Sequence, residues 1–218
     1  MDDQIACGPA SGVGTLVNSV KRHCDDGSLD LLEQALESLC NVTDKCANNQ
    51  VKCGQAGLVQ ILVNLVKRFC DGPAKLLEHA CRALRYIMRN DENKVTCGRA
   101  GGVKALVDLV QRHIDGPTEL LEQASAALVN IAIDAENRVT CGRDGGVKAL
   151  VDLLQRHIDG PAVLLEQACW ALGYIAINTE NRVTCGVAGG VEAVVAVIKR
   201  HCDGSTAVLV LLEVRKPW

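Results

Sequence analysis

Residues 95–117 read VTCGRAGGVKALVDLVQRHIDGP, and residues 139–161 repeat this stretch with only two changes. The Cys-Gly pair inside it recurs along the chain, and the three intervals from Cys53 to Cys185 are each 44 residues long. Leu-Leu-Glu and Asp-Gly recur with the same period of 44–45 residues. Because three separate landmarks share one period, the sequence predicts a single array of repeats along residues 1–218 and no division into two domains. The expected units are residues 1–45, 46–90, 91–134, 135–178 and 179–218, with the last unit degenerate or truncated.

Each unit has a helical pattern of apolar residues. In the fourth unit, Val147, Leu150 and Leu154 form one stripe of a helix. Gly145-Gly146 before it predicts a sharp turn, and Pro161 fits the first position of a longer helix, where its missing N–H costs nothing. A short, a middle and a long helix cannot bury both of their apolar stripes alone. Neighbouring units must therefore stack, which gives an all-α solenoid.

Two segments of the fourth unit carry a family resemblance. GGVKALVDLL (145–154) and EQACWALGYIA (166–176) resemble the middle and third helices of the armadillo repeat, as in importin-α and β-catenin. The turn glycines, the helix pattern and the period agree together over residues 5–205. The resemblance implies a right-handed α-solenoid of about five three-helix repeats, whose third helices line a concave groove. HEAT repeats are the alternative fold, but they lack the short first helix and its Gly-Gly turn.

The composition excludes several classes of partner. Hydrophobic residues make up 48 % of the chain and aromatic residues only 2 %, so the core must be aliphatic. The net charge of −3 shows no basic excess of the kind that favours nucleic acid or anionic membranes. No apolar run reaches the roughly 18–20 residues of a membrane span, and no signal peptide is visible. We expect an intracellular protein of the cytoplasm or nucleus.

The repeated stretch also invites two chemical interpretations, which the sequence disfavours. A phosphate-binding loop needs Gly-Lys followed by Ser or Thr between a strand and a helix, whereas Lys104 follows Val103 between two helices. A zinc site needs close pairs such as C-x₂-C, which are absent from the twelve cysteines. We therefore expect no catalytic residue, no metal and no cofactor.

The cysteine and histidine columns are more typical of packing than of chemistry. Cys70 occupies a position where other repeats carry Ile114 and Ile158, so that position favours a small apolar side chain in a reduced protein. A disulfide between Cys40 and Cys46 stays open, because both cysteines fall outside the columns. The histidine column contains Phe69 as an exception, which favours a packed helix end over a pH-sensitive or metal-binding row. Its members are His23, His113, His157 and His201.

The working surface is expected on the outward side of each third helix. Tyr86, Trp170 and Tyr174 fall there, although aromatic residues used as core filler would favour the apolar stripe. Helical steps along the third helices also end at Asn90, Asp134 and Asn178. The candidate peptide-binding residues are Gln34, Asn41, His79, Arg82, Tyr86, Gln123, Asn130, Gln167, Trp170 and Tyr174.

The resemblance also implies how such a groove binds. In importin-α-like proteins, a Trp and an Asn four residues later grip an extended peptide. Here the residue four positions after Trp170 is Tyr174, and the residue four positions before Asn130 is Ala126. The pair is never complete, so we expect a scaffold for a protein or an extended peptide rather than a receptor for import signals. Asn41 and Asn130 would bond the peptide backbone.

Three alternatives stay open at this point. The chain could be an engineered or truncated fragment without a function of its own, because units three and four are nearly identical. Nucleic-acid binding would require a strongly salt-dependent affinity, which the acidic balance disfavours. The apolar segment 205–214 has no polar side and could mediate self-association.

Overall fold

The computed structural model describes residues 10–201. All regular elements in this range are α-helices, and no strand occurs between residues 10 and 201. The thirteen helices of the described range are α1 (Ala10–Asp26), α2 (Leu29–Thr43), α3 (Ala47–Gln55), α4 (Leu58–Arg68), α5 (Ala74–Ile87), α6 (Asp91–Arg99), α7 (Gly102–Arg112), α8 (Thr118–Ile131), α9 (Ala135–Arg143), α10 (Gly146–Arg156), α11 (Ala162–Ile175), α12 (Thr179–Val187) and α13 (Gly190–His201).

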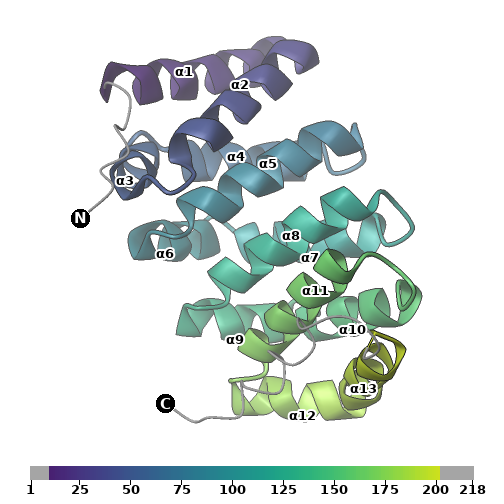
Figure 1. Ribbon diagram of the computed structural model, residues 1–218. Coiled ribbons are helices and arrows are strands. Elements are labelled where there is room, and N and C mark those ends of the chain that lie inside the picture. Colours follow the sequence, from purple (N-terminus) through teal and green to yellow (C-terminus); the bar gives the residue numbers. More distant parts are fainter. Residues whose placement is uncertain (1–9, 202–218) are drawn as a thin grey trace, which may run out of the picture.

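The helices stack in chain order from the N-terminal to the C-terminal end (Figure 1). Helices α2, α5, α8 and α11 pack side by side and form one face, which we call the third-helix face. Helices α4, α7, α10 and α13 pack in the same order behind them, and the short helices α3, α6, α9 and α12 follow one edge. This confirms the all-α repeat stack that the period predicts.

The core runs continuously through the stack and is almost wholly aliphatic. The predicted stripe of the fourth unit, Val147, Leu150 and Leu154, is completely buried. Burial of apolar area contributes about 25 cal/mol per Å², so these stripes supply the main force that holds successive repeats together. A single repeat taken alone would expose one side of this core.

The Gly-Gly turn uses its two glycines differently. Gly145 has φ +84°, a left-handed conformation that side-chain-bearing residues rarely adopt. Gly146 needs space instead, since a Cβ there would lie 2.9 Å from the Cys141 carbonyl oxygen and 3.2 Å from Val107 Cγ2 of the preceding repeat. The turn therefore sets both the direction of the chain and the closeness of adjacent repeats. The predicted place of Pro161 is one residue off, because this proline is the N-cap and α11 begins at Ala162.

The glycine of the Cys-Gly pair belongs to the junction between repeats. A Cβ on Gly98 would lie 1.8 Å from Oδ1 of Asn137, which comes from the following repeat. Asn137 is buried, and its Nδ2 donates to the Lys94 carbonyl at 3.0 Å. Asn93 and Asn181 make the same bond, to Gln50 at 2.9 Å and Arg138 at 2.7 Å. The motif is thus a socket for an asparagine of the next repeat.

The histidines form a second row of links between repeats. In each case Nε2 donates to a backbone carbonyl of the preceding repeat, from His113 to Cys70 at 2.7 Å, and from His157 to Ile114 at 2.6 Å. His201 bonds Ile158 in the same way at 2.7 Å. These contacts give the histidine column the helix-end packing role that its substitution by phenylalanine suggests.

Candidate functional site

The buried cysteines are poor candidates for chemistry. Cys97 and Cys141 are completely buried, and burial raises the pKa of each thiol to about 12, so both stay protonated at neutral pH. The Cys40–Cys46 disulfide that the spacing left open is not formed, because Cys40 is a free thiol. Cys46 is disulfide-bonded, so the expectation of fully reduced cysteines does not hold at this position.

The described part of the chain contains neither a metal-binding cluster nor a single helix able to span a membrane. Between residues 10 and 201, no three His, Cys, Asp or Glu side chains lie close enough to hold a metal ion. No single helix in that range has both the length and the apolar character needed to cross a membrane. Helices α12 and α13 meet both conditions only when they are taken together, and they are bent by 69° at their junction.

The structure places the predicted peptide-binding residues on four adjacent helices, but with different accessibility. Gln34 and Asn41 on α2 are exposed, whereas His79 on α5 is only 5 % exposed. The remaining predicted residues are half-buried, and the three aromatic side chains pack partly against the core. These half-buried residues are Arg82, Tyr86, Gln123, Asn130, Gln167, Trp170 and Tyr174.

The residues at which the helical steps along the third helices end have a different role. Asn90, Asp134 and Asn178 are the N-caps of α6, α9 and α12, and each accepts a hydrogen bond from the backbone N–H three residues later. Such a bond satisfies one of the unpaired donors of a helix start. These three side chains therefore stabilise short helices rather than extend the third-helix face.

A pocket of about 410 Å³ lies between α2 and α5 on the third-helix face and brings three predicted residues together. Arg82 Nη2 donates to His79 Nδ1 at 2.8 Å, so this ring nitrogen must be unprotonated. Burial, with the Arg82 guanidinium as a second cause, lowers the pKa of His79 and keeps the ring neutral. The full lining is Asp30, Glu33, Gln34, Glu37, Lys75, His79 and Arg82.

Sequence reasoning missed Asp30, Glu33 and Lys75 in this lining. Helical steps counted from Trp170 reach Gln34 and His79, whereas Asp30 and Lys75 lie one turn closer to the helix start and Glu33 lies directly before Gln34. Their signal was the Leu-Leu-Glu landmark itself, which places an acidic residue at Glu33 beside the outward row. One wall of the pocket is acidic and the other is basic.

The middle of the face is held by bonds between neighbouring third helices. Two guanidinium groups lie near the Tyr86 ring, with Arg85 Cζ 5.8 Å and Arg89 Cζ 5.0 Å from the ring centre. Arg85 also donates to Gln123 Oε1 at 3.2 Å, and Asn130 Nδ2 donates to the Arg85 carbonyl at 2.7 Å. The amide of Asn130 therefore keeps its oxygen and one N–H for another partner.

The C-terminal part of the face is apolar. Trp170 and Tyr174 on α11 flank Gly173, which is exposed and has no atom within 4 Å of the position of its missing Cβ. The indole Nε1 of Trp170 is buried and has no hydrogen-bond partner, and the same holds for Nε of Arg82. A buried donor without an acceptor costs about 1–3 kcal/mol, so both groups would gain from an added acceptor.

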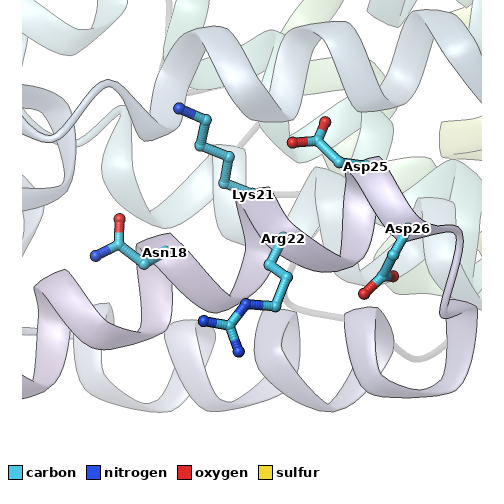
Figure 2. Close-up of a pocket in the computed structure, with 5 residues that line it drawn as sticks. All are labelled: Asn18, Lys21, Arg22, Asp25 and Asp26. Carbon is cyan, nitrogen blue, oxygen red and sulfur yellow. The ribbon is translucent and has the colours of Figure 1, made fainter.

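A second pocket, of about 530 Å³, lies on the outer side of α1. Figure 2 shows its five lining side chains extending from this single helix, with Lys21 and Asp25 on one side and Arg22 and Asp26 on the other. No second element contributes a lining residue. We interpret it as the polar outer surface of the first described helix, and not as a binding site.

Comparisons with known proteins agree with this geometry. The armadillo/beta-catenin-like repeat model matches residues 90–133 and 134–177. An engineered protein from a structural genomics programme is 27 % identical over 97 % of this chain and 84 % of its own, with a TM-score of 0.79. A search of curated proteins finds no match.

Two more distant structures share the fold. A designed armadillo repeat protein in complex with the peptide (KR)4 is 21 % identical, with 95 % of this chain and 91 % of its own covered and a TM-score of 0.72. A beta-catenin structure from a study of a phosphorylation switch in cadherin binding is 16 % identical, with 91 % and 36 % covered and a TM-score of 0.75. Two consecutive armadillo/beta-catenin-like repeats are thus matched within residues 90–177, and the stack of helices has the armadillo repeat fold.

Proposed function

We propose that this chain is a non-enzymatic scaffold that binds an extended segment of a partner protein along the third-helix face. The single observation that carries this proposal is the set of half-buried aromatic side chains on the third-helix face, with Tyr86 on α5 and Trp170 and Tyr174 on α11. Tyr and Trp that combine apolar area with a polar group are typical anchors of protein interfaces. The complex of the designed armadillo protein with a peptide gives a precedent for peptide binding in this fold.

The proposed contact residues have different roles along the third-helix face. Gln34 and Asn41 are exposed and can bond the partner backbone through both their donors and their acceptors. Asn130 would accept a peptide N–H through Oδ1, since its Nδ2 already donates to Arg85. His79 is buried and acts indirectly, because its bond to Arg82 fixes the direction of that guanidinium.

The charges along the face favour a partner with a particular order of residues. The carboxylates of Asp30, Glu33 and Glu37 on α2 make no ion pair within residues 10–201, so a basic partner residue fits there. The guanidinium of Arg82 on α5 favours an acidic residue next. The aromatic surface of α11 favours an apolar residue at the far end. No cofactor takes part in such binding.

Peptide selection tests the proposal. A displayed library of unstructured peptides about twelve residues long, a length that spans several helix spacings of 8–10 Å, should yield binders. These binders should lose at least about tenfold in affinity when Tyr86, Trp170 and Tyr174 are all changed to Ala, because hot-spot aromatics carry most of the binding energy. Circular dichroism checks that helicity is retained.

Two further variants separate the face from the rest of the surface. Glu33→Lys with Glu37→Lys should change the preferred peptide charge over α2 without unfolding the exposed side of that helix. Lys104→Ala with Lys148→Ala, on the exposed side of the middle helices, serves as the control and should leave binding unchanged. If the Lys104/Lys148 control lost as much peptide affinity as the aromatic variant, or if the aromatic variant lost none, the binding site would not be on this face.

We also propose an intracellular location for this scaffold, in the cytoplasm or nucleus. The nine free thiols among the described residues support a reducing compartment. Fractionation of cells that express the tagged chain would test this location directly.

A further inference from the structure

The C-terminal end of the stack exposes apolar residues that earlier repeats bury. Val191 on α13 is 61 % exposed, although its counterpart Val147 on α10 is completely buried. Val194 and Ile198 are half-buried, whereas their counterparts Leu150 and Leu154 are fully buried. In the fourth repeat, α11 packs on α10 and helps to cover its apolar stripe. Among residues 10–201, no following helix covers the corresponding stripe of α13 in this way.

Helix α11 is open on the side that earlier third helices use for their successor. Arg85 on α5 bonds Gln123 of α8, and Cys40 on α2 donates its thiol to the His79 carbonyl of α5 at 3.8 Å. Their counterpart on α11 is Gly173, which is exposed with nothing near the position of its missing Cβ. The uncovered surfaces of α11 and α13 adjoin, because these two helices are in contact.

The sequence after α13 has the composition and position needed to cover this surface. Asp203-Gly204 repeats the Asp159-Gly160 turn that leads into α11, and the next residues, 205–214, read STAVLVLLEV. In the register set by that turn, Leu209 and Leu212 correspond to Leu165 and Ala168, which are buried in the fourth repeat. These residues lie outside the described range, so their predicted self-association also lies outside it.

We propose that residues 205–214 of the same chain dock on the joined surface of α11 and α13. The segment covers Val191 and the open side of Gly173, which continues the packing seen at each earlier third helix. This inference rests on packing alone and does not depend on the proposed peptide binding.

A double-mutant cycle in the full chain tests the contact. Val191→Asp alone, or Leu209→Asp with Leu212→Asp, should each lower the thermal midpoint by about 5 °C or more, because a charge would enter an apolar contact. All three changes together should cost little more than either set alone, since the contact is already broken. Independent, fully additive losses would overturn the proposal.

The chain offers two matched controls for this cycle. Val187→Asp lies at an 86 % exposed position that earlier repeats fill with Arg99 and Arg143, so the thermal midpoint should stay within about 1 °C. Leu211→Gln matches Gln167 in the same register and should also be neutral. If Leu211→Gln costs as much as the Leu209/Leu212 variant, the proposed register is wrong and the proposal fails.

Light scattering distinguishes whether a segment of the same chain or a second copy of the chain covers the surface of α11 and α13. If the segment docks on its own chain, the native protein has the mass of one chain, and its midpoint does not depend on concentration. A dimer whose mass halves in the Val191→Asp variant would show that a second copy covers the surface, which contradicts the proposal. Equal hydrogen exchange of α13 in the native chain and in the Leu209/Leu212 variant would also contradict it.

Discussion

The two ends of the described stack are built on opposite principles. The outer side of α1 carries Asn18, Lys21, Arg22 and Asp25, while its valines face inward and are buried. Helices α12 and α13 instead present Val187 and Val191 outward. A repeat array needs a polar outer side wherever the stacking stops. The comparison indicates that the outer side of α1 is suited to contact with water, whereas the surface of α12 and α13 resembles an internal junction.

The largest expected difference between an internal junction and this C-terminal surface is in thiol reactivity. Cys141 is buried, whereas Cys185, in the same column, is half-buried. Alkylation of Cys141 requires local opening, so at neutral pH iodoacetamide should modify Cys185 at least roughly 100-fold faster. Mass spectrometry of timed digests measures both rates. Equal rates would mean that the last repeat is covered as well as the fourth.

Glycine substitutions sharpen the same comparison through stability. A Cβ on Gly142 would lie 1.7 Å from Oδ1 of the buried Asn181, so Gly142→Ala should cost about 2–3 kcal/mol of unfolding free energy. Gly186 occupies the same column in α12 with nothing within 4 Å, and Gly186→Ala should stabilise the chain by up to about 1 kcal/mol. Urea denaturation measures both, and a destabilised Gly186 variant would show that its socket is occupied.

The histidine row allows a comparison between the N-terminal repeat and the interior. His157 donates to a carbonyl of the preceding repeat, whereas His23 bonds only Asp26 of its own helix, at 3.2 Å. His157→Ala should therefore cost about 1 kcal/mol, and His23→Ala should cost much less. Thermal unfolding of the two variants measures the difference. Equal effects would show that the carbonyl bond contributes nothing to the junction.

The smallest expected effect concerns the exposed ion pairs that cross three of the junctions. Arg112 bonds Asp71 at 2.8 Å, and Arg156 and Arg200 pair with the corresponding aspartates of the preceding repeats. Because these pairs are solvent-exposed and screened by salt, Arg156→Ala should lower the thermal midpoint by only about 1–2 °C at low salt. The loss should vanish at about 1 M salt. A larger loss that salt does not change would point to packing by the arginine stem.

The repeat period was sufficient to predict the fold of this chain. Helix order, turn glycines and the aliphatic core all follow from columns that can be read in one sequence. The asparagine socket was missed, although its signal was present, because Asn49, Asn93, Asn137 and Asn181 recur at the same spacing of 44 residues. Comparing equivalent positions of the repeats shows that a residue type recurs. It does not show which residues of neighbouring repeats are in contact.

The binding face was harder to predict, for a physical reason. Helical steps treat each third helix as an isolated cylinder, whereas its two neighbours cover part of the outward side. His79 and Ala126 are buried for this reason, although both lie on the outward rows. Asn130 was expected to bond the peptide backbone, but one of its two amide N–H groups already donates to the Arg85 carbonyl of the preceding third helix. Such losses depend on the spacing between helices, which a one-dimensional pattern does not contain.

The asparagine socket makes every repeat compatible with a copy of itself. Each unit offers a glycine notch on one side and an asparagine on the other, so two identical units fit together without any new contact. A tandem duplication of one whole period would therefore repeat the same pairing inside the array. The near identity of residues 95–117 and 139–161 fits this tolerance. Such a chain can change in length by whole units while its folding rules stay the same.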